Sequence, residues 1–130
     1  MIEEIWTPGE LEHFLGLKST ILHIDVDWSI YAVRVRPVVH QLRDDIQSHT
    51  GLTSVFLRRI DMTEQESSPL WKVTLEWLKT NGAGDDALIS GYGALLWIKD
   101  GRLSDSVIYP ELEGREKLML RTLKQFSTSE

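Results

Sequence analysis

Residues 20–37 read TILHIDVDWSIYAVRVRP, and this stretch decides the fold. Its first part, Thr20 to Val26, is largely apolar and β-branched, which is typical of a strand covered on both faces. From about Tyr31 to His49 the apolar residues recur on one helical face. Pro37 lies inside that segment, and we expect it to kink the helix. A buried strand that leads through a short turn into a long helix is typical of an α/β protein.

The segment before this stretch predicts a short strand and a helix. Ile2 and Ile5 indicate a strand that ends near Trp6. Thr7 then caps a helix, in which Glu10 completes a capping box. These elements make up residues 1–19.

The segment after it predicts further strands and helices. One helix follows a cap at Ser67 or Ser68, and Asp100-Gly101 is a strong hairpin signal. The predicted strands cover residues 53–60, 94–98 and 103–109, and the predicted helices cover residues 69–80 and, after a turn at 110–114, residues 115–126. The pattern predicts a central mixed sheet of about five strands flanked by about four helices. We expect one domain over residues 1–130, with a frayed tail at 127–130.

The composition excludes several kinds of function. The chain has 130 residues, 14 basic and 20 acidic side chains, a net charge of −6 and no cysteine. Without a thiol there is no disulfide, no thiolate nucleophile and no zinc–cysteine site. The acidic balance argues against a nucleic-acid partner. The N-terminus shows no secretory signal pattern and no apolar run reaches membrane-spanning length, so we expect a cytoplasmic protein with no membrane partner.

Four stretches resemble the thioredoxin family, in the family's order. The turn from Trp28 to Ala32 stands where thioredoxins have Trp-Cys-Gly-Pro-Cys, and Pro37 follows at the spacing of the family's helix kink. Arg59-Ile60-Asp61 resembles the family's Asn-Ile-Asp strand end, and residues 91–101 (GYGALLWIKDG) resemble its Gly-Ile-Pro-Thr-Leu-Leu-Leu-Phe-Lys-Asn-Gly stretch. The resemblance covers about residues 20–126 and implies a thioredoxin-like fold.

The departures from the family lie at its chemical groups. By the resemblance, Ser29 and Ala32 occupy the positions of the two redox cysteines, and Gly93 that of the cis-proline. His23 occupies the position of the buried acid that assists proton transfer. A serine hydroxyl cannot form a disulfide, so thiol–disulfide exchange is excluded. The resemblance therefore implies a redox-inactive member with no catalytic residue and no cofactor.

A hydrolytic role for Ser29 is the minor alternative. His23, Asp25 and Asp27 would share one face of the strand and could form a relay to the hydroxyl. The simpler interpretation makes His23 a buried histidine and places both acids where the strand reaches solvent. For metal binding, the four histidines show no paired ligand spacing, and we predict no metal site.

Aromatic residues point to a binding surface instead. By the resemblance, Trp28, Tyr31 and Tyr92 meet at the end of the sheet that carries the active site in thioredoxins. Exposed aromatics beside Ile30 would form the kind of apolar patch that marks interaction sites. Alternatively, these rings cover the loop and fill the space left by the lost proline. The candidate binding residues are Trp28, Ser29, Ile30, Tyr31, Ala32, Tyr92 and Gly93.

We therefore expect a protein or peptide partner, in an adaptor or chaperone-like role. Cysteine-free thioredoxin-like domains occur as accessory proteins of nickel–iron hydrogenase maturation, and the likeness to them is one of fold and lost cysteines. The alternative is a structural subunit or homodimer that uses the helix carrying Trp71 and Trp77. The arginine pairs Arg34/Arg36 and Arg58/Arg59 either contact acidic groups of a partner or are solvated surface charges.

Overall fold

The computed structural model describes residues 2–63, 68–83 and 91–126, and its centre is a mixed sheet of five strands. The strands are β1 (Glu3–Ile5), β2 (Ser19–Asp25), β3 (Phe56–Asp61), β4 (Leu95–Lys99) and β5 (Arg102–Val107). Their spatial order is β1-β3-β2-β4-β5. β1, β3 and β2 run parallel, whereas β4 pairs antiparallel with both β2 and β5. The predicted mixed sheet is confirmed.

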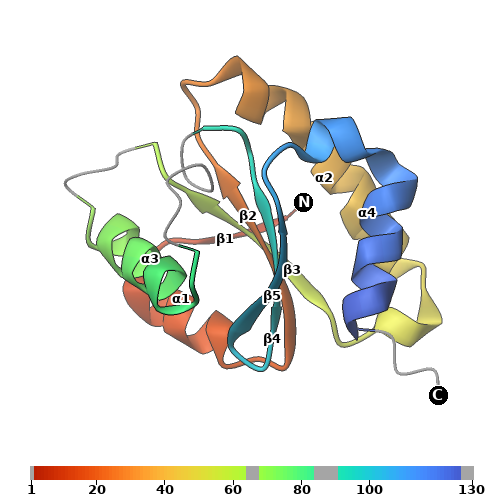
Figure 1. Cartoon of the computed structure of the whole chain (residues 1–130), viewed down its shortest axis with the longest axis horizontal. Helices are drawn as coiled ribbons and strands as arrows, with labels where there is room; N and C mark the ends of the chain where they lie inside the picture. The colour runs from red at the N-terminus through yellow and green to blue at the C-terminus, as the bar shows by residue number, and fades with distance from the viewer. Residues whose placement is uncertain (1, 64–67, 84–90, 127–130) are drawn as a thin grey trace.

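Two pairs of helices cover the two faces of the sheet (Figure 1). α1 (Pro8–Leu15) and α3 (Pro69–Thr80) lie on one face, and α2 (Ile30–Gln47) and α4 (Pro110–Phe126) lie on the other. Each face buries its own apolar cluster. On the side of α2 and α4 the cluster includes Trp97 of β4, whose indole Nε1 donates to Thr122 Oγ1 at 3.0 Å. The four predicted helices are therefore present.

Local signals in the sequence explain where several elements begin and end. Thr7 Oγ1 accepts a hydrogen bond from the backbone N–H of Glu10 at 3.1 Å, and the Glu10 carboxylate accepts from the N–H of Trp6 at 3.3 Å. Asp100 and Gly101 have φ values of +53° and +79°, as a two-residue hairpin turn requires. The predicted cap and hairpin are confirmed, and Ser68 caps α3.

Other boundaries and faces differ from the prediction. β3 begins at Phe56 rather than Thr53, because a 3₁₀ turn over Thr50–Leu52 and a further turn at residues 53–54 occupy the preceding residues. The predicted turn at 110–114 is the first part of α4, which is broken by Gly114 at φ +82°. Ser67 and the tail at 127–130 lie outside the described residues.

The buried face of α3 also differs from the one predicted by its apolar residues Leu70, Val73 and Trp77. Val73 is exposed, while Thr74 is buried with its hydroxyl donating to the Leu70 carbonyl at 2.7 Å. Trp71 and Trp77 are partly buried against the core on this side, and Trp77 Nε1 donates to the Gly101 carbonyl at 3.3 Å. The helix therefore turns its tryptophans inward instead of presenting them as an exposed surface. In the described part of the chain, no helix has the length and apolar character needed to cross a membrane.

Candidate functional site

The start of α2 holds the residues that the sequence singled out. Ser29 is buried and is the N-cap of α2, with its Oγ 3.5 Å from the backbone nitrogen of Ala32, whose N–H it accepts. Ala32 is fully buried on the inner side of the first turn. A capping serine satisfies one of the free N–H groups at a helix start. Both side chains therefore have structural roles that need no reactive group.

Gly93 packs against this first turn in a conformation that favours glycine. Its φ is +75°, and a Cβ at this position would lie 3.0 Å from Val35 Cβ and 3.3 Å from Ala32 Cα. By the resemblance, Gly93 occupies the place of the cis-proline, and the residues that the structure describes contain no cis peptide bond. The loop before β4 therefore approaches the helix through its backbone, at a spot where a side chain would not fit.

Trp28 lies beside a second glycine of the same loop. A Cβ on Gly91, whose φ is +96°, would lie 2.6 Å from Cη2 of the Trp28 ring. The ring packs on this bare backbone, yet 57% of Trp28 remains exposed. The glycine thus provides room for the ring, and the other side of the indole faces solvent.

Three tyrosines from separate segments meet at this end of the molecule. The Tyr31 and Tyr92 rings are 5.8 Å apart in an edge-to-face arrangement, and the Tyr92 and Tyr109 rings are 4.9 Å apart. Tyr31 is 55% exposed and Tyr109 47% exposed, with the half-buried Tyr92 between them. Desolvation, reinforced by Tyr92, raises the pKa of Tyr109.

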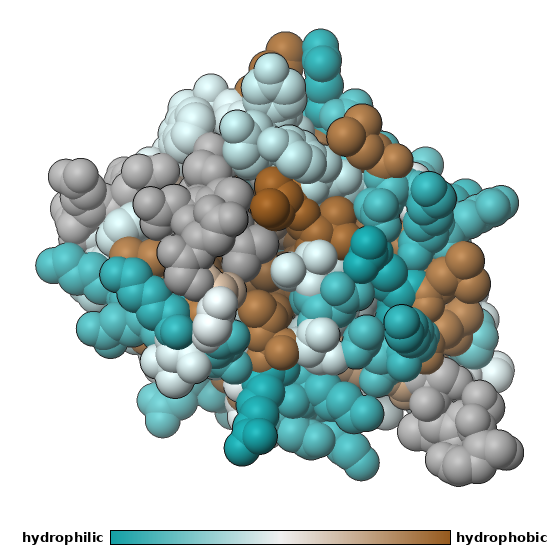
Figure 2. Space-filling model, in the orientation of Figure 1, coloured by the Kyte–Doolittle hydropathy of each residue, from teal (hydrophilic) through white to brown (hydrophobic). Residues whose placement is uncertain are grey.

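We call the group formed by Trp28, Ile30, Tyr31, Tyr92 and Tyr109 the aromatic surface. In Figure 2, pale and brown atoms gather at the upper end of the molecule, where Figure 1 places the start of α2, whereas the lower edge is mostly teal. Ile30 is 59% exposed at the first helical position. The predicted residues Trp28, Ile30, Tyr31 and Tyr92 do lie at one end of the sheet.

Tyr109 is the member of the aromatic surface that the sequence reasoning missed. A usable signal was present in the hairpin, because counting outward from the two-residue turn at Asp100-Gly101 places residue 109 beside residue 92. The observed ladder pairs Leu95 with Val107 and contains a bulge near Trp97. Tyr92 accordingly lies just before the start of β4, and Tyr109 lies just after the end of the neighbouring strand β5.

His23 and Asp25 are placed differently from the predicted relay. His23 is buried and its Nε2 has no hydrogen-bond partner among the described residues. Burial lowers the pKa of His23 to about 4, against an opposing effect of Asp25. No hydrogen bond joins Ser29 to His23 in the part of the chain that is described. The site therefore lacks the contact between hydroxyl and base that a serine nucleophile requires.

Asp25 corrects the expectation that this acid lies in solvent. It is fully buried, and its Oδ2 accepts from Arg36 Nε at 2.8 Å and from Arg59 Nε at 2.7 Å. Despite burial, its pKa lies below the usual value, because His23 and the two guanidinium groups favour the carboxylate. Asp27 is exposed, as expected, and binds Arg36 Nη2 at 2.7 Å.

The arginine pairs are likewise not simple surface patches. Arg36 and Arg59 belong to the buried network around Asp25, and Arg58 binds Glu3 at 2.8 Å. Only Arg34 matches the interpretation as a solvated charge, since it is exposed. Among the described residues, no group of three or more histidine, aspartate and glutamate side chains is arranged to hold a metal ion.

Solved thioredoxin structures match this chain over nearly its whole length. A point mutant of the thioredoxin from Halobacterium salinarum NRC-1 has a TM-score of 0.64 at 15% identity, with 98% of this chain and 93% of that chain covered. The oxidised thioredoxin from Plasmodium falciparum has a TM-score of 0.63 at 11% identity, with 98% and 100% covered. The chain has the thioredoxin fold.

The thioredoxin fold is thus present without the thioredoxin chemistry. The thioredoxin from Malassezia sympodialis is also similar, with a TM-score of 0.61 at 15% identity and 98% and 92% of the two chains covered. No family model and no curated protein matches the sequence. Because the chain has no cysteine, it cannot exchange thiols and disulfides with groups of its own.

Proposed function

We propose that this thioredoxin-fold chain is a non-catalytic adaptor or chaperone-like protein that binds a protein or peptide through its aromatic surface. The observation that carries the proposal is the cluster of Tyr31, Tyr92 and Tyr109 at the end of the sheet where the fold's catalytic relatives keep their active site, with Tyr31 and Tyr109 exposed and Tyr92 half-buried between them. Tyrosine and tryptophan dominate the energetics of protein interfaces, because one rigid ring buries a large area and its polar group finds a partner.

The groups beneath the aromatic surface support binding rather than reaction. Ser29 caps a helix, Ala32 is buried and Gly93 fills a close backbone contact. None of them presents an activated nucleophile, which would need a base within hydrogen-bond reach. The arrangement offers contact area and hydrogen-bonding hydroxyls and no reacting atom.

The test is a quantitative pull-down with the purified chain from a lysate of the source organism. We expect Tyr31→Ala/Tyr92→Ala to reduce recovery of the specific partner by tenfold or more, as loss of two interface hot spots would. Leu120→Ala is the matched control, because Leu120 is 65% exposed on α4 and is not part of the aromatic surface. Circular dichroism verifies that each variant is folded.

Equal recovery of every partner by the wild type and the double tyrosine variant would refute the proposal. Sedimentation of the purified chain over a range of concentrations tests the alternative, a homodimer. A dimer that dissociates in Tyr31→Ala/Tyr92→Ala but not in Leu120→Ala would make a second copy of the chain the partner.

A further inference from the structure

The outer edge of the sheet at β1 has no neighbouring strand among the described residues. β1 is the terminal strand in the order β1-β3-β2-β4-β5, and in the described part of the chain no strand pairs with its outer side. Its three residues, Glu3–Ile5, pair in parallel with Arg58, Arg59 and Ile60 of β3. An open edge offers N–H and C=O groups to which an extended peptide can add as a further strand.

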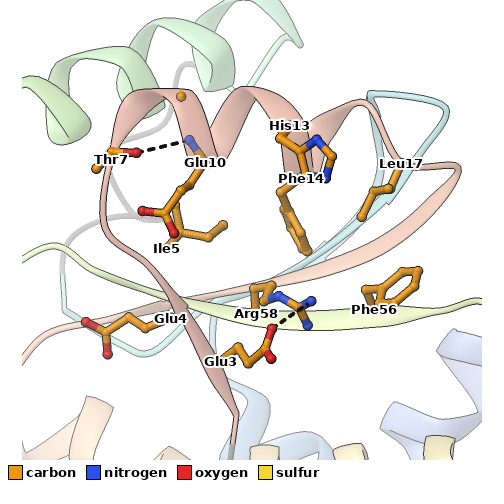
Figure 3. A pocket seen from close by; sticks show the side chains of 11 residues that line it. Glu3, Glu4, Ile5, Thr7, Glu10, His13, Phe14, Leu17, Phe56 and Arg58 are labelled. Atoms are coloured by element: carbon orange, nitrogen blue, oxygen red, sulfur yellow. Dashed lines mark hydrogen bonds and ion pairs between the residues drawn. The ribbon is translucent and has the colours of Figure 1, made fainter.

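A groove lies directly beside this edge, between α1 and the strands β1 and β3 (Figure 3). It encloses about 580 Å³. Ile5, Phe14, Leu17 and Phe56 supply its apolar wall, and 39% of Phe56 is exposed. A groove of this size can take one or two side chains of an added strand. It shares no residue with the aromatic surface.

The charges around the groove favour a cation. Glu3, Glu4 and Glu10 line it together with Arg58 and His13, so acidic groups outnumber basic ones. Glu3 is neutralised by Arg58 and Glu4 by Arg59, whereas no ion pair of Glu10 is present among the described residues. The Glu10 carboxylate accepts only the N–H of Trp6 among those residues, and the whole chain carries a net charge of −6. Glu10 is exposed in the first turn of α1, where the helix N-terminus and the Trp6 N–H stabilise its carboxylate but no cation among the described residues pairs with it, so a basic side chain of a partner would add an ion pair there.

We propose that an extended basic segment of a partner protein adds to the open edge of β1 and fills this groove. The segment places an apolar and a basic side chain two residues apart, so that strand periodicity turns both toward α1. The apolar side chain packs against Phe14 and Leu17, and the basic one meets Glu10. Main-chain hydrogen bonds to β1 supply affinity, and the groove supplies specificity.

The experiment titrates the isotope-labelled chain with the synthetic peptide Lys-Leu-Thr-Lys-Thr-Leu-Lys and follows backbone amide signals by NMR. We expect saturable shifts in residues 3–5 and in α1. The peptide Lys-Ser-Thr-Lys-Thr-Ser-Lys, which keeps the charge and loses the apolar side chains, and Glu-Leu-Thr-Glu-Thr-Leu-Glu, which reverses the charge, are expected to bind at least tenfold more weakly.

Variants at Glu10 test the charge directly. Glu10→Gln keeps an oxygen that can accept from the Trp6 N–H. It is expected to weaken peptide binding about two- to fivefold, which corresponds to the loss of one partly exposed ion pair. Glu10→Lys is expected to weaken it roughly tenfold. Glu116→Gln, at an exposed position of α4, is the control and should leave the affinity unchanged.

Three results would each overturn the proposal. These are no binding of the Lys-Leu-Thr-Lys-Thr-Leu-Lys peptide, equally tight binding of the peptide with serine in place of leucine, or NMR shifts that do not include residues 3–5 of β1. The outcome is separable from the proposed function. Peptide binding at β1 is expected to persist in Tyr31→Ala/Tyr92→Ala, because these two substitutions change only the aromatic surface, which shares no residue with the groove.

Discussion

At the residue scale, His23 shows how strongly burial in the sheet affects the protonation of a side chain. It lies on β2, where Asp25, Arg36, Arg59 and His40 face it around a small cavity of about 200 Å³. Burial favours the neutral imidazole, and the two arginines add to that effect, while Asp25 opposes it. The sequence correctly predicted a buried histidine. It could not predict the arginines around it, because these come from α2 and β3.

His23 makes the stability of the fold depend on pH in a defined window. Its pKa is about 4 in the folded chain and 6.5 when unfolded, so between these values the unfolded chain binds the extra proton. The free energy of unfolding should therefore fall by up to about 3 kcal/mol as the pH drops from 6.5 to 4. Urea titrations at a series of pH values measure this slope.

His23→Gln should flatten that slope, and His13→Gln, at an exposed position, should not. Asp25 acts in a lower window, because its pKa is depressed below 3.8 and its contribution is lost only as the pH falls below that value. A slope between pH 6.5 and 4 that is the same in His23→Gln and the wild type would rule out His23 as its origin.

At the element scale, the helix caps and the hairpin were predictable because their signals are local. Thr7, Ser68 and the Asp100-Gly101 turn act within four residues of their own backbone. The start of β3 and the buried face of α3 were not predicted correctly. In α3 the hydroxyl of Thr74 bonds within its own helix, which lets this polar residue take a core position that the apolar pattern had given to Val73.

Ser29 is expected to act only as the cap of its helix. Ser29→Ala should lower the free energy of unfolding by about 1 kcal/mol, and Ser29→Asp should restore most of it. Ser68→Ala is the matched control, because Ser68 caps α3 in the same way. Its Oγ lies 3.4 Å from the backbone nitrogen of Trp71, and the Ser29 Oγ lies 3.5 Å from the backbone nitrogen of Ala32. Chemical denaturation measures both. A loss at Ser29 several times larger than at Ser68 would show that Ser29 does more than cap α2.

At the scale of the whole molecule, one buried carboxylate connects four elements. Asp25 of β2 binds Arg36 of α2 and Arg59 of β3, and Arg59 also binds Glu4 of β1. Each guanidinium has a second acidic neighbour, so every charge of the network has a partner although Asp25 is fully buried. The network joins these elements through charge-assisted hydrogen bonds.

Removing the central charge should therefore be costly. Asp25→Asn leaves two partly buried guanidinium groups facing a neutral amide, and we expect it to lower the free energy of unfolding by about 3 kcal/mol. Asp45→Asn is the control, since the Arg115–Asp45 pair has a short 2.6 Å contact but an exposed arginine, and should cost less than about 1 kcal/mol. Comparable losses in the two variants, measured by urea unfolding, would contradict this account.

The sequence by itself determined the order of strands and helices, the caps, the hairpin turn and the absence of thiol chemistry, because each depends on local pattern or on residue type. Only the tertiary structure decided that Asp25 is buried between two arginines, that Tyr109 joins Tyr31 and Tyr92, and that an acidic groove lies beside β1. The physical reason is that burial and pairing are set by neighbours from distant segments. For Asp25 those neighbours lie 11 and 34 residues away along the chain.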